Sequence, residues 1–257
     1  MASLHAESTG EGPTLALAHG FTQTGGLWGR FGQLVGRGRR VVSVDLPGHG
    51  GSTEIRVDLV EGAALLVEAG GARPFDLLGY SLGARFALHA ALGAPERIAR
   101  LILISGTAGI EANDARAERR RRDEDTATRL ETEPDVDAFV ASWLAAPMFA
   151  TLRAGHAGIE ERRRNTPAGL ASSLRLAGAG TQAPLWGRLD ELTMPVLVLA
   201  GATDPRYAAL GSRLARGVAH GAFALVPGAG HAVHLEQPEV TAAIVRSWLT
   251  ATEARGD

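Results

Sequence analysis

The stretch that decides the fold is LLGYSLGAR, residues 77–85, which contains the pattern G-x-S-x-G around Ser81. The apolar residues before the serine predict a strand, and RFALHAAL after it predicts a helix. A serine at a tight turn between a strand and a helix exposes its hydroxyl at the end of the sheet, with the positive helix N-terminus behind it. The two glycines of the pattern leave room for that turn. We therefore expect Ser81 to be a reactive serine and not part of an ordinary glycine-rich turn.

Five other short apolar runs, bounded by glycine and proline, have the same sequence pattern as the run before Ser81. They are rich in Val, Leu and Ile and show little polar alternation, which is typical of parallel strands covered by helices on both faces. Helical patterns lie between several of them, so the chain is predicted to be an α/β protein with an open, mostly parallel sheet. The expected strands are 14–20, 40–48, 75–81, 100–106, 195–201 and 223–230. The expected helices between and after them are 54–70, 82–92, 206–218 and 237–250.

The alternation of strands and helices stops between residues 111 and 190, where helical patterns carry dense charge clusters and no convincing strand occurs. We predict a helical cap at 111–190, inserted into a core made of 1–110 and 191–257. In the helix ARAERRRRDE, Glu118 with Arg122 and Arg120 with Glu124 are spaced to form surface ion pairs. The chain ends, 1–12 and 251–257, are expected to be frayed.

Composition excludes several classes of protein. The chain of 257 residues is 45% hydrophobic, enough for a sizeable core, yet it has no apolar run of ~18 residues that predicts a membrane span. The formal net charge of −2 gives no general attraction to nucleic acid or membrane. With no cysteine and no signal-peptide pattern at the start, we expect a cytoplasmic protein, a monomer or small homo-oligomer, that acts on a small molecule.

Two further residues complete a candidate catalytic triad. A serine hydroxyl becomes a good base or nucleophile only when a histidine takes its proton and an acid orients that histidine. Asp204 follows the strand 195–201, and His231 follows the strand 223–230. Both positions lie at the carboxyl ends of parallel strands, where sites of this architecture gather. Taken alone, Asp204 could begin a helix and His231 could be a solvated loop residue, but order and position together favour the triad.

The loop after the first strand, AHGFTQTGG, places the backbone N–H groups of Phe21 and Thr22 near this site. With the N–H of Leu82 after the serine, the N–H of Phe21 is expected to form an oxyanion hole, while His19 holds the loop. His231 and His234 form an H-x-x-H pair, but no third ligand stands at a suitable spacing. We therefore expect no metal and no cofactor.

Cations near the serine point to the charge of the substrate. Arg85 lies in the first turns of the helix after Ser81, where it opposes the helix dipole at a cost of about 0.3–1 kcal/mol. Either a carboxylate of the cap pairs with it, or it faces the pocket and binds an anionic ligand. All 26 basic residues are arginine, so the choice of Arg over Lys carries no information. A cationic cap over a serine triad favours a small carboxylate substrate, while Trp143 and Trp186 are either pocket wall or core.

Several motifs resemble known families. HGF (19–21), DLPGHGGS (45–52), GYSLGAR (79–85), GATD (201–204) and GAGHAVHLEQPE (228–239) resemble the α/β-hydrolase fold. SGTAGI (105–110), the ARAERRRRDE helix, WLAAPMFA (143–150) and LRLAGAGTQAPLW (174–186) resemble a lyase of menaquinone synthesis, 2-succinyl-6-hydroxy-2,4-cyclohexadiene-1-carboxylate (SHCHC) synthase. The resemblance runs from about residue 12 to 250. Two departures are small: Ala84 stands where the family commonly has glycine, and GAGTQAPLW replaces G-T-G-x-Q-P-S-L-W.

The resemblance implies a specific reaction. That family removes pyruvate from a cyclohexene tricarboxylate without metal or organic cofactor. It implies that the triad residues are catalytic and that six further residues contact the substrate. These are Arg85, Arg119, Arg162, Tyr80, Trp143 and Gln182.

Three functions remain open at this point. The first is the pyruvate-eliminating lyase, in which Ser81 acts as a base and no acyl-enzyme forms. The second is a serine hydrolase acting on an acidic ester or thioester through an acyl-enzyme. The third is a ligand-binding relative without catalysis, which an intact triad disfavours. The triad does not separate the first two, and only the cations and the motifs of the cap favour the lyase.

Overall fold

The structure, a computed structural model, describes residues 2–254. Every strand predicted from the sequence is present, and the side chains of each alternate between two helical layers. In β2 (Thr14–Ala18), Leu15 and Leu17 pack into one layer, whereas Ala16 and Ala18 pack into the other. This two-sided burial explains why the strand sequences are apolar throughout.

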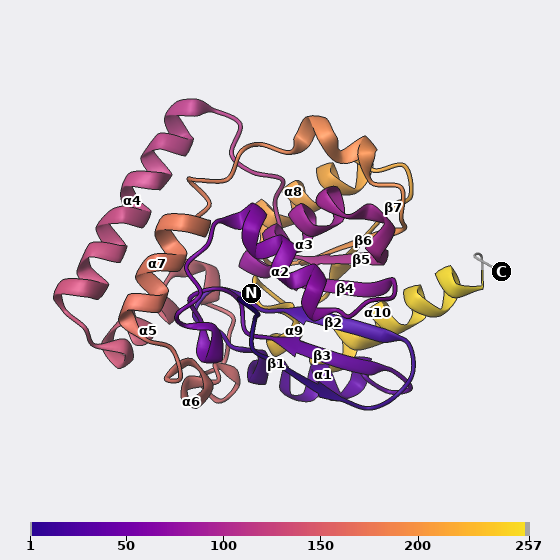
Figure 1. The fold of residues 1–257 in the computed structure, drawn as a ribbon, viewed down its shortest axis with the longest axis horizontal. Coiled ribbons are helices and arrows are strands. Elements are labelled where there is room, and N and C mark those ends of the chain that lie inside the picture. The colour runs from indigo at the N-terminus through magenta and orange to yellow at the C-terminus, as the bar shows by residue number, and fades with distance from the viewer. Residues whose placement is uncertain (1, 255–257) are drawn as a thin grey trace.

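The sheet has seven strands in the order β1-β3-β2-β4-β5-β6-β7, and it confirms the prediction of a mostly parallel α/β fold (Figure 1). All neighbouring strands are parallel except β1 and β3. The other six strands are β1 (Ala6–Thr9), β3 (Arg40–Val44), β4 (Phe75–Tyr80), β5 (Ile98–Ile104), β6 (Val196–Gly201) and β7 (Gly221–Val226).

Strand β1 was not predicted. We expected residues 1–12 to be frayed, but residues 6–9 pair with residues 41–44 of β3. The side chains of β1 are all exposed, so the strand is held at the sheet edge by backbone hydrogen bonds and leaves no apolar pattern in the sequence. At the other end, the last helix continues to Glu253, and residues 255–257 lie outside the described part.

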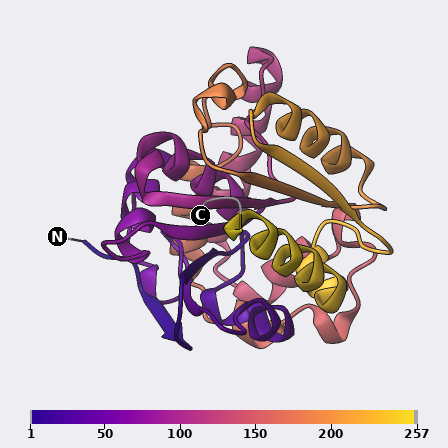
Figure 2. The ribbon, with the colours of Figure 1, turned by 90° about the vertical axis from the view of Figure 1, so that its right-hand side faces the viewer.

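Helices cover both faces of the sheet. One face carries α2 (Leu59–Ala69), α3 (Leu82–Gly93) and α8 (Pro205–Gly217), and the other carries α1 (Gly29–Val35) and α10 (Pro238–Glu253). Figure 2 shows α8 and α10 on opposite sides of the sheet. No helix within residues 2–254 combines the length and apolar character needed to cross a membrane. The short helical turns are Gly25–Trp28, Gly50–Ser52, Pro95–Arg97, Pro147–Phe149, Ala154–His156, Trp186–Glu191 and α9 (Val233–Glu236).

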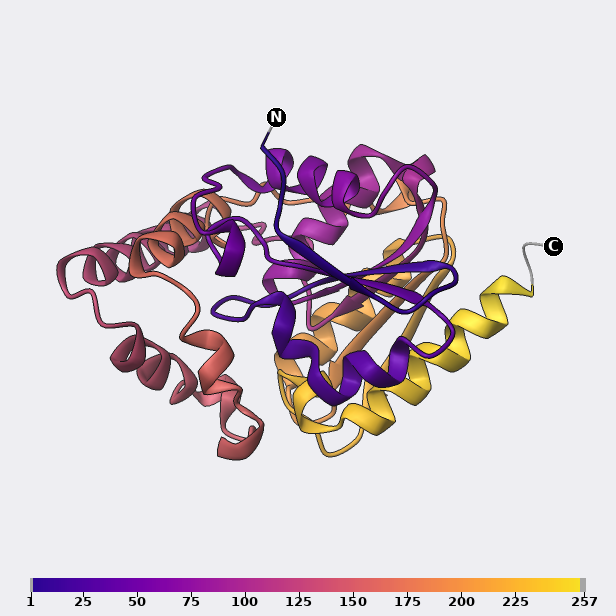
Figure 3. The same ribbon diagram turned by 60° about the horizontal axis from the view of Figure 1, so that its bottom comes forward.

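The chain between β5 and β6 contains only helices among its regular elements, and we call residues 113–191 the helical segment. It lies beside one end of the sheet, coloured magenta to orange in Figures 1 and 3. Five of its buried residues form an apolar cluster separate from the two clusters that contact the sheet. That cluster consists of Ala127, Leu130, Leu170, Ala171 and Leu174. The helices of the segment are α4 (Asn113–Thr132), α5 (Val136–Leu144), α6 (Ile159–Arg162) and α7 (Pro167–Ala177).

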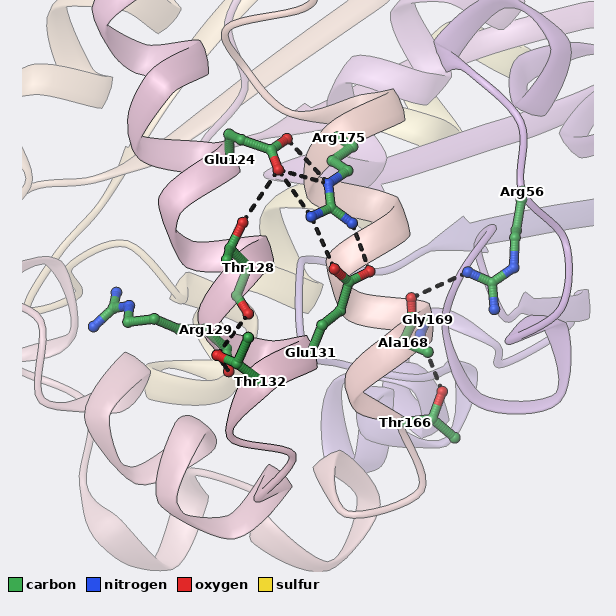
Figure 4. Close-up of polar contacts among 10 residues, drawn as sticks. All are labelled: Arg56, Glu124, Thr128, Arg129, Glu131, Thr132, Thr166, Ala168, Gly169 and Arg175. Carbon is green, nitrogen blue, oxygen red and sulfur yellow. Dashed lines mark hydrogen bonds and ion pairs between the residues drawn. The ribbon is translucent and has the colours of Figure 1, made fainter.

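An exposed ion cluster joins α4 to α7 (Figure 4). Arg175 donates from Nε to Glu124 at 3.0 Å and from Nη1 to Glu131 at 2.5 Å. Of the two ion pairs predicted along α4, the pair between Arg122 and Glu118 forms, with Nε and Oε1 3.0 Å apart. The predicted pair between Arg120 and Glu124 does not form, because Glu124 binds Arg175 across the interface instead. Spacing along one helix did not reveal this competing partner on another helix.

A buried ion cluster lies at the opposite end of the strands from Ser81. Asp76, at the start of β4, is 1% exposed and accepts from Arg39 Nη1 and Arg100 Nε, each at 2.6 Å. Glu253, at the end of α10, also contacts both arginines. The cluster thereby ties the last helix to the sheet.

We expect Asp76→Ala to lower the free energy of unfolding by about 3–5 kcal/mol, because it removes the buried carboxylate that Arg39 and Arg100 share and leaves them only the more exposed Glu253. Urea denaturation measures this loss. Arg175→Ala serves as the comparison, because it removes a solvent-screened cluster and should cost clearly less. Equal losses in the two variants would contradict the assignment of Asp76 as the stronger support.

Candidate active site

Ser81 lies at the sharp turn between β4 and α3, with φ 52° and ψ −103°. Such a conformation is strained for a residue with a Cβ, and it is held by a hydrogen bond of 2.9 Å from the Ser81 N–H to the Ile104 carbonyl. A Cβ on Gly83 would lie 1.9 Å from the carbonyl oxygen of Ala18, and one on Gly79 would lie 2.3 Å from the carbonyl oxygen of Gly83. The two glycines of the pattern are therefore required by close backbone contacts.

The three residues predicted as a triad meet in a chain of hydrogen bonds. The distance from His231 Nε2 to Ser81 Oγ is 3.1 Å, and the distance from His231 Nδ1 to Asp204 Oδ2 is also 3.1 Å. Asp204 also caps α8 by accepting from the N–H of Tyr207. Burial raises the pKa of Asp204, but hydrogen bonds from His231 and Tyr207 outweigh it and hold that pKa below its usual value. An ionised Asp204 favours a proton on Nδ1, which leaves Nε2 to accept the serine proton.

The loop that carries His231 is held by two residues that the sequence analysis missed. The carboxylate of Glu236 accepts from the N–H groups of Gly230 at 2.8 Å and Ala232 at 3.0 Å. Ser105 Oγ donates to the carbonyl oxygen of His231 at 2.8 Å. Glu236 occurs in the motif that ends the chain's last loop, but nothing in the sequence alone showed that its carboxylate turns back onto the backbone around His231.

The proposed oxyanion donors, Phe21 and Leu82, both line the cavity in front of Ser81. In the part of the chain that the structure describes, neither of their N–H groups donates to another protein atom. The N–H of Thr22, also near the site, is engaged by His49 Nε2 at 3.4 Å. Phe21 and Leu82 therefore have the free donors that an oxyanion site needs.

Two buried histidines support this loop. His19 Nδ1 donates to the Gly20 carbonyl at 2.8 Å and its Nε2 accepts from the Leu46 N–H at 3.0 Å, so the ring links two loops as expected. Burial lowers the pKa of His19 to about 4 and, with the adjacent His19, that of His49 to about 3. Both rings are therefore neutral near pH 7 and serve as fixed hydrogen-bond partners.

His234 does not join His231 in a metal site. Its ring is buried against Trp28 and Tyr80, and neither of its nitrogens has a hydrogen-bond partner. Burial lowers its pKa to about 3. Within residues 2–254, no group of three or more His, Asp or Glu side chains is placed to hold a metal ion.

A cavity of about 630 Å³ opens over Ser81 between the carboxyl ends of the strands and the helical segment. The sequence left two alternatives for Trp143, the pocket wall or the core. Trp143 lies in the wall of the cavity, where its ring packs edge-on against Phe21. Trp186 is outside the cavity; its Nε1 donates to Gly109 and Arg213 lies over its ring. The charged residues of the wall are Arg85, Arg119, Arg122, Asp123, Asp204 and Arg206.

Arg85 lines the cavity without a counterion. Its side chain is buried and Nη1 donates to the Ala177 carbonyl at 2.6 Å, but no carboxylate of the described chain forms an ion pair with it. Burial and the nearby cation of Arg119 lower the pKa of Arg85 to about 10, so it remains charged near pH 7. Of the two roles left open by the sequence, the structure excludes pairing with a carboxylate of the helical segment.

The other residues predicted to contact substrate differ in position. Arg119 lines the cavity and pairs with Asp123, at 2.8 Å from Nε to Oδ1. Arg162, Tyr80 and Gln182 are buried and are not part of the cavity wall. Arg162 donates to the Ala157 carbonyl and to the Thr22 hydroxyl instead. The resemblance to the family implied that these three residues contact the substrate, but it could not show which way their side chains point.

Arg206 is a cavity cation that the sequence analysis missed. It follows Asp204 by two residues, and its charge helps lower the pKa of that carboxyl. The sequence could have predicted this position, because Arg206 lies two residues after the triad acid, at the carboxyl end of β6 where the site forms.

Together, the parallel sheet, the strained serine turn and the ordered Ser81–His231–Asp204 contacts have the architecture of an α/β hydrolase. The alpha/beta hydrolase family profile matches residues 15–244. The malate-bound structure of a thermophilic esterase from Thermogutta terrifontis aligns with a TM-score of 0.83 and 27% identity, covering 97% of this chain and 93% of that chain.

Two further relatives indicate a more specific family within the alpha/beta hydrolases. An Escherichia coli O1:K1 / APEC protein named 2-succinyl-6-hydroxy-2,4-cyclohexadiene-1-carboxylate synthase is 34% identical over 232 residues, 88% of this chain and 89% of that protein. The structure of MenH from S. aureus aligns with a TM-score of 0.90 and 26% identity, covering 97% of this chain and 99% of that chain. The chain belongs to the alpha/beta hydrolase family and, within it, to the family of this SHCHC synthase, and it is an enzyme. The resemblance inferred from its motifs is confirmed.

We expect His234→Leu to weaken the acid sensitivity of the fold. The folded-state pKa of His234 lies below the ordinary value of 6.5, so its contribution to stability is present above 6.5 and is lost as the pH falls towards about 3. Free energies of unfolding, measured by denaturation across that pH range, should therefore fall less steeply in the variant. A slope unchanged from the wild type would show that His234 is not held neutral.

Proposed function

We propose that this enzyme eliminates pyruvate from 2-succinyl-5-enolpyruvyl-6-hydroxy-3-cyclohexene-1-carboxylate to give SHCHC in menaquinone biosynthesis. The observation that carries the proposal is the cation of Arg85, which faces the cavity beside Ser81 without a counterion. A substrate carboxylate would supply the missing negative charge. The names of the relatives, together with their coverage of nearly the whole chain, support the same reaction.

The helical segment supplies one side of the substrate cavity in this proposal. Residues 111–190 act as a cap over a core formed by 1–110 and 191–257. Arg119 and Trp143 of the cap face Ser81 and Leu82 of the core across the cavity, so substrate contacts both parts at once. The separate apolar cluster between α4 and α7 supports a cap that is folded around its own side chains.

The proposed elimination uses Ser81 as a base. His231 Nε2 accepts the serine proton, and the serine oxygen then removes a proton from an acidic carbon of the substrate. The electron pair of that C–H bond forms one ring double bond, the existing ring double bond shifts by one position, and the ring carbon–oxygen bond to the enolpyruvyl group breaks, which turns the cyclohexene into a cyclohexadiene. The departing oxygen keeps the bonding pair, and protonation yields pyruvate. No bond forms between Ser81 and the substrate.

Charge that develops during this reaction meets fixed donors. The N–H groups of Phe21 and Leu82 would stabilise the enolate-like oxygen, and they need no rearrangement because no protein acceptor occupies them. Arg85 and Arg119 would hold carboxylates away from the reacting carbon. Asp204 stays ionised and stabilises the imidazolium that forms on His231.

A second candidate is a serine hydrolase for an anionic ester or thioester. It is favoured by the likeness to the malate-bound thermophilic esterase and by a triad geometry that serves nucleophilic attack equally well. In that reaction Ser81 would form an acyl-enzyme, which water would later cleave.

We expect Ser81→Ala to lower kcat for pyruvate release by at least about a thousandfold, since it removes the proposed base. Purified protein is supplied with the enolpyruvyl substrate, and pyruvate is followed by a coupled dehydrogenase. Mass spectrometry during turnover checks for an added acyl mass on the wild type. Accumulation of an acyl-enzyme, with no pyruvate release, would replace the lyase by the hydrolase.

We expect Arg85→Ala to lower kcat/KM by about tenfold to a hundredfold, the effect of losing one charge-assisted hydrogen bond to a carboxylate. Arg119→Ala should act in the same direction. Arg121→Ala is the matched control, because Arg121 lies on the same helix as Arg119, pairs with Glu118 and does not line the cavity. Steady-state kinetics of the three variants measure these changes in kcat/KM. An Arg85→Ala variant with unchanged kcat/KM would remove the main support for a carboxylate substrate.

A further inference from the structure

The loop that carries the proposed oxyanion donor contains a strained residue. Thr22, directly after Phe21, has a φ of 66°. A β-branched residue rarely adopts this left-handed conformation, because its side chain crowds the backbone. Surrounding contacts must therefore hold Thr22 in place, and its orientation sets the direction of the peptide groups on either side of it.

One buried amide makes the contact that fixes this residue. Asn165 Nδ2 donates to the carbonyl oxygen of Thr22 at 2.8 Å and to that of Arg162 at 2.9 Å. Its Oδ1 accepts from the N–H of Gly50 at 3.1 Å. The side chain is 4% exposed, so all three hydrogen bonds are shielded from water. Asn165 thus joins the loop after β2, the loop after β3 and the helical segment.

Neighbouring residues of the helical segment contact the same loop. Arg162 donates to the hydroxyl of Thr22, and Glu161 accepts from the hydroxyl of Thr24 at 2.7 Å. Asn165 differs from both because it binds the backbone of Thr22 and therefore acts on the path of the chain itself. The opposite side of the loop is held by His49, which accepts from the N–H of Thr22.

We propose that Asn165 is a positioning residue for the oxyanion site: it holds Thr22 in its strained conformation so that the Phe21 N–H stays free and directed at the cavity. The inference rests on the oxyanion role assigned to Phe21 in the proposed function. Asn165 does not line the cavity, so it acts on the reaction only through the loop.

The test compares two variants with a neighbouring control. Asn165→Ala removes all three hydrogen bonds, and Asn165→Asp keeps an acceptor for Gly50 while turning oxygen towards two carbonyl groups. Thr53→Val is the control, because it removes a 2.6 Å hydroxyl contact between Thr53 and Thr166, also between core and helical segment, without touching the oxyanion loop.

We expect both Asn165 variants to lower kcat for pyruvate release at least about tenfold while KM changes by less than about threefold. Thr53→Val should leave both constants near those of the wild type. Backbone hydrogen exchange, followed by mass spectrometry on peptides spanning residues 18–28, should be faster in the Asn165 variants and unchanged in the control. Unchanged exchange in the Asn165 variants, or an equal loss of kcat in the control, would overturn the proposal.

A failure of the proposed function can be distinguished from a failure of the role proposed for Asn165. If wild-type enzyme releases no pyruvate, the lyase assignment is wrong, and the rate at which a fluorophosphonate labels Ser81 replaces kcat. The phosphoryl oxygen of that probe needs the same donors as an oxyanion, so labelling should be slower in the Asn165 variants than in wild type and Thr53→Val. Equal labelling rates in all variants would overturn the role of Asn165.

Discussion

The close contact between the first turn of α3 and the end of β2 fixes the geometry on which the site depends. The Gly83 N–H donates to the His19 carbonyl at 2.9 Å, and the space beside Gly83 is too small for any side chain. This one contact places the turn of Ser81 against the loop of Phe21. The two proposed oxyanion donors, which come from different loops, therefore hold a constant separation, as preorganised stabilisation of charge requires.

The electrostatic character of the site follows from burial. Its supporting histidines, His19 and His49, are neutral because full burial disfavours their charged forms. Arg85, by contrast, keeps its charge with only a carbonyl for a hydrogen-bond partner. Positive charge in the wall thus lies on arginine side chains that line the cavity, while the two histidines that support the loop of Phe21 are uncharged.

Local sequence was sufficient to predict the parts of the molecule that local patterns control. The apolar strands and the glycines around Ser81 leave clear patterns, and the order of Ser81, Asp204 and His231 follows from strand succession. Strand β1 could not be predicted from the sequence, because its side chains are exposed and it pairs with β3 entirely through the backbone. Helix α1 was missed for a different reason: it buries Phe31 and Val35, but it has only seven residues, two of them glycine, which is too short for a clear helical pattern.

Contacts between distant segments could not be predicted in this way. Glu124 had a suitable partner on its own helix, yet it binds Arg175 of α7. The family resemblance implied that Arg162 binds substrate, but its side chain is buried and contacts Thr22 instead. Ser105 and Glu236 act on the backbone around His231, and no spacing in the sequence encodes such contacts. Each of these depends on side-chain direction, which only the packed fold determines.

The cluster of Asp76 with its two arginines lies at the far end of the sheet from the serine, so stability and chemistry have separate locations along the same strands. Substitutions in the wall of the cavity leave this anchor intact, and loss of the anchor does not alter a group that faces substrate. A lineage built on this scaffold can therefore exchange its helical segment and acquire a new substrate while the ion cluster and the sheet beneath it remain unchanged. The fold can in this sense change at one edge while its support at the other edge stays the same.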